Sequence, residues 1–454
     1  YCVDRDALRA PMLLRGGAAA CGMRLPGGEN FGVDDVALLV GPEATVPVID
    51  VAEQEQQGRD WTLGEWASYF ARKEAGAHKV LNVLSLEISG TRLGDAVAAP
   101  RFVRDLDWID CTPADERPKV QKYCLMSAGG SFTDWHVDMG GSSVWYHVVS
   151  GEKRFWCAAP TEENLGAYAR WISSRDQSAT WFGDCVGADQ VASFALGPGM
   201  TLSLPSGWLH AVYTPEDSLV LGGNYLHSRA FATQLAVFSL EKRCRVDAEC
   251  RFPHWVETVA YGAAADARHK AVSANDAGAR RLLSETLKSW SSGGGSLTAS
   301  ERRRLEAALA RVAVDFAALE SDVVGAAPER TKDNLDAYVA RGLQVTAAER
   351  AEFLESAVSV RAKALLRAPR EEVDKDDKND RDWGAPKPKT LYDSDDSDAS
   401  DEDDTTGLGI AELKARYGVN KGPREKRPAS SNGSGPKKRK KALKAPIDRF
   451  ARRR

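Results

Sequence analysis

The residues best suited to chemistry are His136 and Asp138, in the stretch TDWHVDMGG at residues 133–141. Side chains two positions apart on a β-strand point to the same face, so this imidazole and carboxylate would stand side by side. Such a pair can bind a metal ion, or it can form an ordinary buried hydrogen bond. A metal site needs a further ligand, and His210, which follows a Pro-Ser-Gly turn in PSGWLHAVYT, is the candidate among the seven histidines.

Two histidines and one carboxylate can form a facial triad, which binds Fe(II) and leaves the opposite positions open for a co-substrate and oxygen. An α-keto acid that chelates the iron carries a second, distal carboxylate, which needs a buried cation. Lys153 in SGEKRFW could supply that cation, and Thr133 could add a hydrogen bond. Thr133 lies three residues before His136, so the two point to opposite faces unless the strand bends between them.

The other histidines fit the site less well. His147 is expected to be a satisfied core histidine, pointing to the opposite face from its neighbour Tyr146. His227 is expected to be structural. The remaining three, His78, His254 and His269, lie outside the β-rich region.

The elements that must hold these residues are short strands. Residues 118–228 consist of runs rich in Val, Tyr, Trp and Leu, separated by turn signals such as GG, SGEK and GPG. This pattern of many short strands separated by turns predicts a sandwich, a jelly roll or a barrel. Upstream and within this region, strands are predicted at 45–51 and 79–89, helices at 60–75 (with Thr62 as cap) and 163–174, and a helical or mixed element at 32–41.

Beyond about residue 255 the composition becomes rich in Ala, Leu and Arg, which predicts helices. An apolar stripe from Leu305 to Val323 predicts one helix over 298–324, with a Thr298/Glu301 capping box and a flexible GGGS joint before it. From about residue 371 the chain is polar, with an acidic serine run at 393–404 and a basic cluster, PKKRKK, at 436–441. Blocks of like charge at low hydrophobicity predict a disordered tail.

Bulk properties narrow the class of protein. The chain has 454 residues and a formal net charge of -4, enough for one large domain and a second unit. Its eight cysteines include no C-x-x-C, which excludes a zinc finger and favours reduced thiols in an intracellular protein. No apolar run is long enough to cross a bilayer. The chain starts at Tyr1, so we expect a fragment whose upstream modules are missing.

A family resemblance joins these motifs. In order, VQKYCLMS, TDWHVDMGGSSVWYHVVSGEKRFW, PSGWLHAVYTP and GGNYLHS resemble the JmjC domains of histone lysine demethylases, in the branch that carries PHD fingers or F-box and CXXC modules. The resemblance covers about residues 8–265. It implies a mainly β fold with helices: a double-stranded β-helix (a JmjC/cupin-like jelly roll) flanked by helices. The implied division is a lead-in at 1–87, the JmjC domain at 88–245, a helical region at 246–370 and the tail at 371–454.

Carried over residue by residue, the resemblance assigns roles at the site. It implies Fe(II) ligation by His136, Asp138 and His210, contact of Thr133 and Lys153 with 2-oxoglutarate, and pocket-lining positions for Asn82, Tyr146 and Asn224. Trp135 and Met139 stand where the family usually has Phe, which would reshape the pocket wall.

The resemblance implies an enzyme that uses Fe(II), 2-oxoglutarate and O2 to remove methyl groups, mono- or dimethyl, from lysines of the histone H3 tail in nucleosomes. Two alternatives are a JmjC protein hydroxylase and a non-catalytic chromatin scaffold. The PKKRKK cluster predicts import into the nucleus, and it could also bind DNA without sequence preference.

Overall fold

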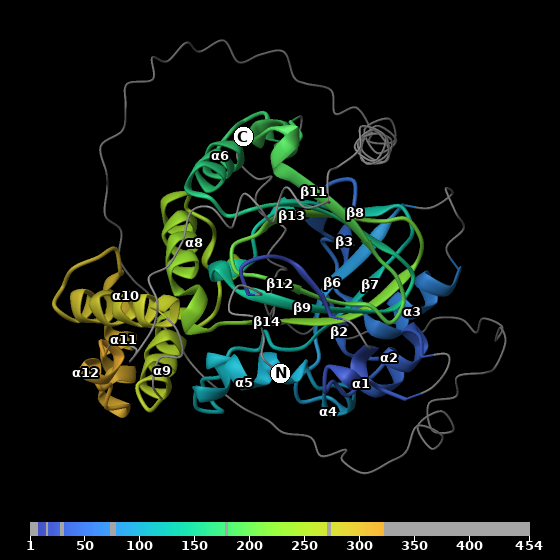
Figure 1. Ribbon diagram of the computed structural model, residues 1–454. Helices are drawn as coiled ribbons and strands as arrows, with labels where there is room; N and C mark the ends of the chain where they lie inside the picture. The colour runs from blue at the N-terminus through green and yellow to red at the C-terminus, as the bar shows by residue number, and fades with distance from the viewer. Residues whose placement is uncertain are drawn as a thin grey trace, which may run out of the picture.

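Two antiparallel β-sheets packed face to face form the centre of the protein, with helices on their outer sides (Figure 1). The computed structural model describes residues 8–14, 17–27, 31–72, 79–177, 180–269 and 274–321. The strands are β1 (Met12–Leu14), β2 (Thr45–Val46), β3 (Ile49–Asp50), β4 (Glu55–Gln56), β5 (Trp61–Thr62), β6 (Leu81–Glu87), β7 (Tyr123–Ser127), β8 (Ser131–His136), β9 (Ser143–Ser150), β10 (Lys153–Ala158), β11 (Val191–Leu196), β12 (Thr201–Leu204), β13 (Leu209–Thr214) and β14 (Ser218–Tyr225). The helices are α1 (Gly17–Ala20), α2 (Val33–Val40), α3 (Leu63–Arg72), α4 (Arg92–Ala96), α5 (Arg101–Leu106), α6 (Glu162–Ile172), α7 (Phe182–Val186), α8 (Phe231–Arg243), α9 (Trp255–Asp266), α10 (Ala274–Ser291), α11 (Ala299–Arg311) and α12 (Phe316–Leu319).

The sheet topology is that of a jelly roll, which confirms the predicted fold class. The larger sheet has the order β1-β12-β9-β14-β7-β6-β3-β4, and the smaller has the order β11-β10-β13-β8. Neighbours far apart in sequence pair with each other, such as β8 with β13 and β9 with β14. The division expected after residue 87 separates β6 from β7, which are hydrogen-bonded neighbours, so the lead-in and the jelly roll share one sheet.

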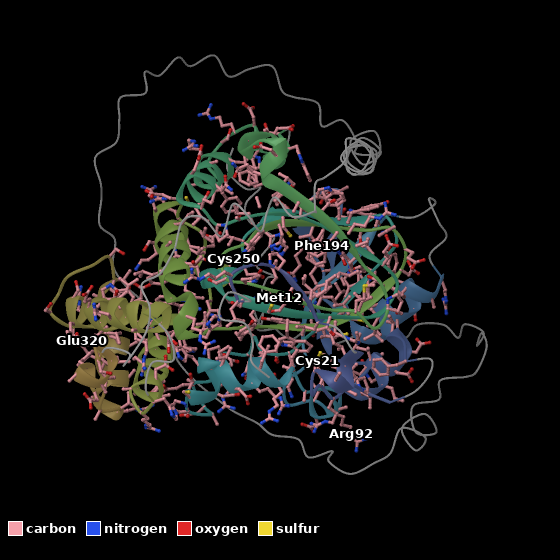
Figure 2. The ribbon with its side chains drawn as sticks, in the orientation of Figure 1. Met12, Cys21, Arg92, Phe194, Cys250 and Glu320 are labelled. Atoms are coloured by element: carbon pink, nitrogen blue, oxygen red, sulfur yellow. The ribbon has the colours of Figure 1, made fainter. Side chains whose placement is uncertain are left out.

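Strand alternation divides the core into layers. On β10, Phe155 and Cys157 belong to the cluster between the two sheets, while Trp156 belongs to a cluster on the outer face of the smaller sheet. Tyr168 of α6 and Phe182 of α7 cover that outer face. Figure 2 shows side chains filling the space between the sheets. Burying each such large apolar side chain stabilises the fold by about 1.5–3 kcal/mol.

The lead-in elements cover the outer face of the larger sheet. Val36 of α2 and Trp66 of α3 pack there with Met126 of β7. The predicted cap is confirmed: the Thr62 hydroxyl accepts the Glu65 N–H at 3.2 Å, and the Glu65 carboxylate accepts the Thr62 N–H at 2.9 Å. The single strand predicted over 45–51 is wrong. It is divided into β2 and β3, with Pro47, which has no N–H to donate, between them.

Helices α8 to α12 form a separate cluster beside the sandwich, on the left in Figure 1. The Thr298/Glu301 capping box is confirmed at the start of α11. The single helix predicted over 298–324 is wrong, because α11 ends at Arg311 and α12 begins at Phe316. Val312 is extended, and Asp315 caps α12 by accepting the Ala318 N–H at 3.0 Å. The GGGS joint is a turn whose Gly293 carbonyl accepts a hydrogen bond from Arg302 at 3.2 Å.

Several sequence predictions lie outside the described residues. They include His78, the part of the helical region beyond residue 321, the acidic run at 393–404 and the basic cluster at 436–441. The seven described cysteines are all free thiols. Within the described ranges, none of the helices combines the length and apolarity that crossing a membrane requires.

Candidate active site

The three predicted metal ligands lie together at one end of the sandwich interior. His136 ends β8, Asp138 follows it, and His210 is on β13, directly opposite His136 in the strand pairing. Their candidate ligand atoms all lie within 4.8 Å of one another, and the His210 Nε2 is 3.9 Å from the Asp138 Oδ2. Within the described residues this is the one group of three or more His, Cys, Asp or Glu side chains that could hold a metal ion.

Both imidazoles are held in the orientation that a metal ligand needs. The Nδ1 of His136 lies 2.9 Å from the Asp134 carbonyl, and the Nδ1 of His210 lies 3.0 Å from the Trp208 carbonyl. A carbonyl can only accept a hydrogen bond, so each Nδ1 carries the hydrogen and each Nε2 keeps its lone pair. A backbone partner of this kind commonly fixes the tautomer of metal-binding histidines.

The electrostatics of the cluster suit a bound cation. Burial, and for His136 also the neighbouring His210, lowers the pKa of His136 and His210 to about 4, which keeps both rings neutral at physiological pH. Burial raises the pKa of Asp138, and the neighbouring His136 and the hydrogen bond from Asn224 offset only part of that rise. A metal ion would supply positive charge to a ligand set of two neutral nitrogens and one carboxylate.

A β-bulge brings Thr133 to the face of His136. Along β13 the register runs from His210 to Val212, two residues, while the paired stretch of β8 runs from His136 to Thr133, three residues. The extra residue in β8 reverses the alternation, so Thr133 and His136 line the same cavity. This is the bend that the sequence alone left open.

Lys153 is buried inside the sandwich without a counter-charge. Its side chain is only 1% exposed, and its Nζ donates to the Ser127 hydroxyl at 2.6 Å and the Thr214 hydroxyl at 2.8 Å. No carboxylate of the described residues forms an ion pair with it, and burial lowers its pKa to about 7. A buried ammonium held only by two neutral hydroxyls is suited to an anionic ligand, because an isolated buried charge is costly.

Asn224 connects β14 to Asp138, one of the candidate metal ligands. Its Nδ2 donates to the Asp138 Oδ1 at 3.3 Å and to the Ser142 hydroxyl at 2.8 Å. The side chain therefore orients the carboxylate and lines the cavity from the larger sheet. On the opposite side, the Gly140 N–H donates to the Glu241 carboxylate of α8 at 2.7 Å, which fixes the turn after Asp138.

One cavity of about 140 Å³ unites most of the predicted site residues. Its lining includes Thr133, His136, Asp138, Tyr146, Lys153, His210 and Asn224. Asn82 is not among the lining residues; it is buried on β6, opposite Ser127, whose hydroxyl accepts the Lys153 hydrogen bond. His147 is the satisfied core histidine that was predicted, 2.8 Å from the Thr201 hydroxyl. His227 is buried 3.4 Å from the Ser143 hydroxyl, which suits the structural role expected for it.

The predicted change to the pocket wall is half right. Met139 lines the cavity, but Trp135 does not, because it is the neighbour of His136 on β8 and so points to the opposite face, the outer face of the smaller sheet. There its ring packs edge-on against Trp181 and Phe182, with centroids 5.2 and 5.4 Å away. Sequence reasoning missed Ser127, Thr214 and Glu241, since an isolated Ser, Thr or Glu carries no motif.

The comparisons with known proteins agree with this geometry. No family model matches the chain. The chain is 44% identical over 243 residues, 51% of its length and 36% of the relative's, to JmjC domain-containing histone demethylation protein 1 of Mycosarcoma maydis. Over 265 residues, 56% of this chain and 52% of the relative, it is 41% identical to a protein of the same name in Debaryomyces hansenii. Over 275 residues, 57% of this chain and 24% of the relative, it is 40% identical to lysine-specific demethylase 2A of Xenopus tropicalis.

The fold and the cluster define a class: a jelly-roll protein whose interior holds two histidines and one carboxylate, the set of ligands that can form a facial triad. The matched part of the chain is similar to JmjC histone demethylases, among them lysine-specific demethylases 2A and 2B and histone lysine demethylase PHF8. The chain spans about a quarter to a half of the length of the relatives named above.

Proposed function

We propose that this protein is an Fe(II)- and 2-oxoglutarate-dependent histone lysine demethylase. The observation that carries the proposal is the pairing of the His136, Asp138 and His210 cluster with the uncompensated ammonium of Lys153 in one cavity. A metal site alone fits many chemistries. A metal site that shares its cavity with a buried cation fits a chelating dicarboxylate.

The residues of the chain have separate roles in this proposal. His136, Asp138 and His210 would hold iron on one side, and Lys153 with Thr133 would hold the distal carboxylate of 2-oxoglutarate. When bound, iron and 2-oxoglutarate supply the oxidation by O2 that hydroxylates an N-methyl group, which then leaves as formaldehyde.

The remaining residues shape and orient the site. Asn224 orients Asp138, and Tyr146 closes the cavity wall, with its ring edge-on to Phe155 at a centroid distance of 5.3 Å. Leu202 and Val212 of the apolar interior exclude water around the co-substrate. Dry surroundings strengthen the pairing of Lys153 with an anion, because the local dielectric constant is low.

The proposed substrate is a mono- or dimethylated lysine of the histone H3 tail, and the proposed compartment is the nucleus. The relatives named above are a histone demethylation protein and a lysine-specific demethylase, which supports a histone substrate. Nuclear import through the basic cluster at 436–441, and DNA contact through the same cluster, rest on sequence alone.

Product mass tests the proposal directly. The full chain would be incubated with methylated H3 peptides, Fe(II), ascorbate and 2-oxoglutarate, beside a His136→Ala control. Loss of methyl mass with the parent and not with the control is expected. Gain of one oxygen would indicate a protein hydroxylase instead, and peptide binding without turnover of either kind would indicate a scaffold.

A further inference from the structure

A buried glutamine of the lead-in segment contacts the strand that carries the metal ligands. Gln54 lies in the turn between β3 and β4 and is 7% exposed. Its φ of 53° is in the left-handed region, which a non-glycine residue rarely adopts without support from its surroundings. All three of its hydrogen bonds are made by its side-chain amide, and two of them reach β8.

The two bonds to β8 bracket Thr133. The Gln54 Nε2 donates to the Phe132 carbonyl at 3.1 Å, and its Oε1 accepts the Asp134 N–H at 3.1 Å. Among the described residues β8 is the edge strand of the smaller sheet, and a side chain can pair with the outer side of such a strand. The side-chain amide therefore serves as one peptide unit of an added strand, placed at the bulge.

Through Asp134, Gln54 is linked to His136, the first proposed metal ligand. Asp134, whose N–H donates to Gln54, offers its carbonyl to the Nδ1 of His136 at 2.9 Å. Gln54 thus fixes the backbone residue that orients the His136 ring. It also fixes both peptide groups flanking Thr133, on the opposite side of the bulge.

The turn that carries Gln54 is itself held in place. The Gln54 Nε2 also donates to the Val51 carbonyl at 2.7 Å, which ties the side chain to this turn. Asp50, fully buried, accepts the Ala52 N–H at 3.0 Å and pairs with Lys79. The turn can therefore act as a fixed support and does not simply follow β8.

We propose that Gln54 is a positioning residue for the metal centre. By pinning the β8 bulge, it sets the placement of His136 relative to Thr133, and so of the metal relative to the carboxylate end of the co-substrate. This inference rests on the proposed function, since it takes His136 as a metal ligand. The inference gives the lead-in segment, which carries none of the proposed metal ligands, a role in positioning the metal centre.

Two substitutions separate the amide from the backbone conformation. Gln54→Ala removes the amide and keeps a Cβ in the left-handed region, while Gln54→Gly removes the amide and relieves that strain. Gln54→Ala should therefore melt at a lower temperature than Gln54→Gly. If the amide positions the site, both variants should lose metal affinity to the same extent, about 10- to 100-fold, as for other residues that orient ligands.

The measurement is Co(II) titration of the full chain, followed by the visible absorption bands of the bound ion and by their shift when 2-oxoglutarate is added. Glu53→Ala, an exposed change in the same turn, is the matched local control. Val36→Ala, in a buried cluster on the outer face of the larger sheet, is the control for a general loss of stability. Gln54→Glu keeps an acceptor for the Asp134 N–H and should be intermediate.

The outcomes separate this inference from the proposed function. Weaker Co(II) binding with altered bands in both Gln54 variants, and in neither control, is the expected result. Unchanged affinity in the Gln54 variants, or a loss that Val36→Ala matches at equal stability, would overturn the role of Gln54 and leave the metal site standing. A parent that binds no Co(II) would overturn the metal site itself, and the role of Gln54 with it.

Discussion

Replacing Lys153 by methionine should move stability and co-substrate binding in opposite directions. Methionine has a similar length and no charge. With a pKa of about 7 against 10.5 for an ordinary lysine, the buried ammonium costs on the order of 4 kcal/mol of stability at pH 7. Its hydrogen bonds to Ser127 and Thr214 return about 1 kcal/mol each. Lys153→Met is therefore expected to stabilise the ligand-free protein by about 2 kcal/mol.

The same change should weaken 2-oxoglutarate binding. A hydrogen bond to a charged group contributes about 1.5–3 kcal/mol, so affinity should fall roughly ten- to hundredfold. Calorimetric titration of 2-oxoglutarate into the Mn(II)-loaded protein measures this, and thermal melts of the ligand-free protein measure the stability. Equal affinity in parent and variant would refute the assignment of Lys153. A destabilised variant would refute the reasoning that its charge is uncompensated.

The pH dependence of Lys153 has a defined sign. Because its pKa is lower in the folded state, the unfolded chain binds the extra proton between pH 7 and 10.5, and stability from this group rises with pH over that window. Binding of 2-oxoglutarate follows the opposite course, since Lys153 loses its charge above pH 7 and the affinity of the parent should fall. Lys153→Met should show neither dependence, and a parent whose affinity stays flat from pH 7 to 9 would contradict this.

Four further substitutions test the Asn224 contacts at the site and the helices beside the sandwich. Asn224→Ala removes the hydrogen bond to Asp138 and should weaken Co(II) binding about tenfold or more, with Ser142→Ala as a milder companion. Gly262→Ala would place a Cβ 2.3 Å from the Trp108 ring and should destabilise the fold by about 1–3 kcal/mol in denaturant titrations, without changing the Co(II) spectrum. Thr298→Ala removes the cap of α11 and should cost about 1 kcal/mol in the same titrations; no loss would show that α11 does not unfold with the rest.

The residue patterns predicted a sandwich, a jelly roll or a barrel and singled out His136, Asp138 and His210 as candidate ligands, and the family resemblance narrowed the fold to a jelly roll. The H-x-D spacing and the turn before His210 are visible in the chain itself. The bulge in β8 could not be predicted, because it depends on the register between β8 and β13. For that reason the sequence left open whether Thr133 lies on the same face as His136.

Contacts between segments far apart in sequence were equally hidden. Nothing in the residues around Gln54 indicates that its amide reaches a strand 80 residues later. The two hydroxyls that hold Lys153 lie 26 and 61 residues from it. The helix break before α12 was missed for another reason: the spacing of apolar residues continues through it, while the Asp315 cap interrupts the backbone.

The strand order has a consequence for how the protein is made. Since β8 pairs with β13, and β9 with both β12 and β14, no nascent chain that ends before β13 can contain the complete ligand cluster. During synthesis the Gln54 side chain can form its hydrogen bonds to β8 only after β8 has been made, and His136 can pair with His210 only after β13 has been made. Such long-range pairing slows folding. If the cluster binds iron as proposed, the ion can meet all three ligands only after β13 has been made and has paired with β8.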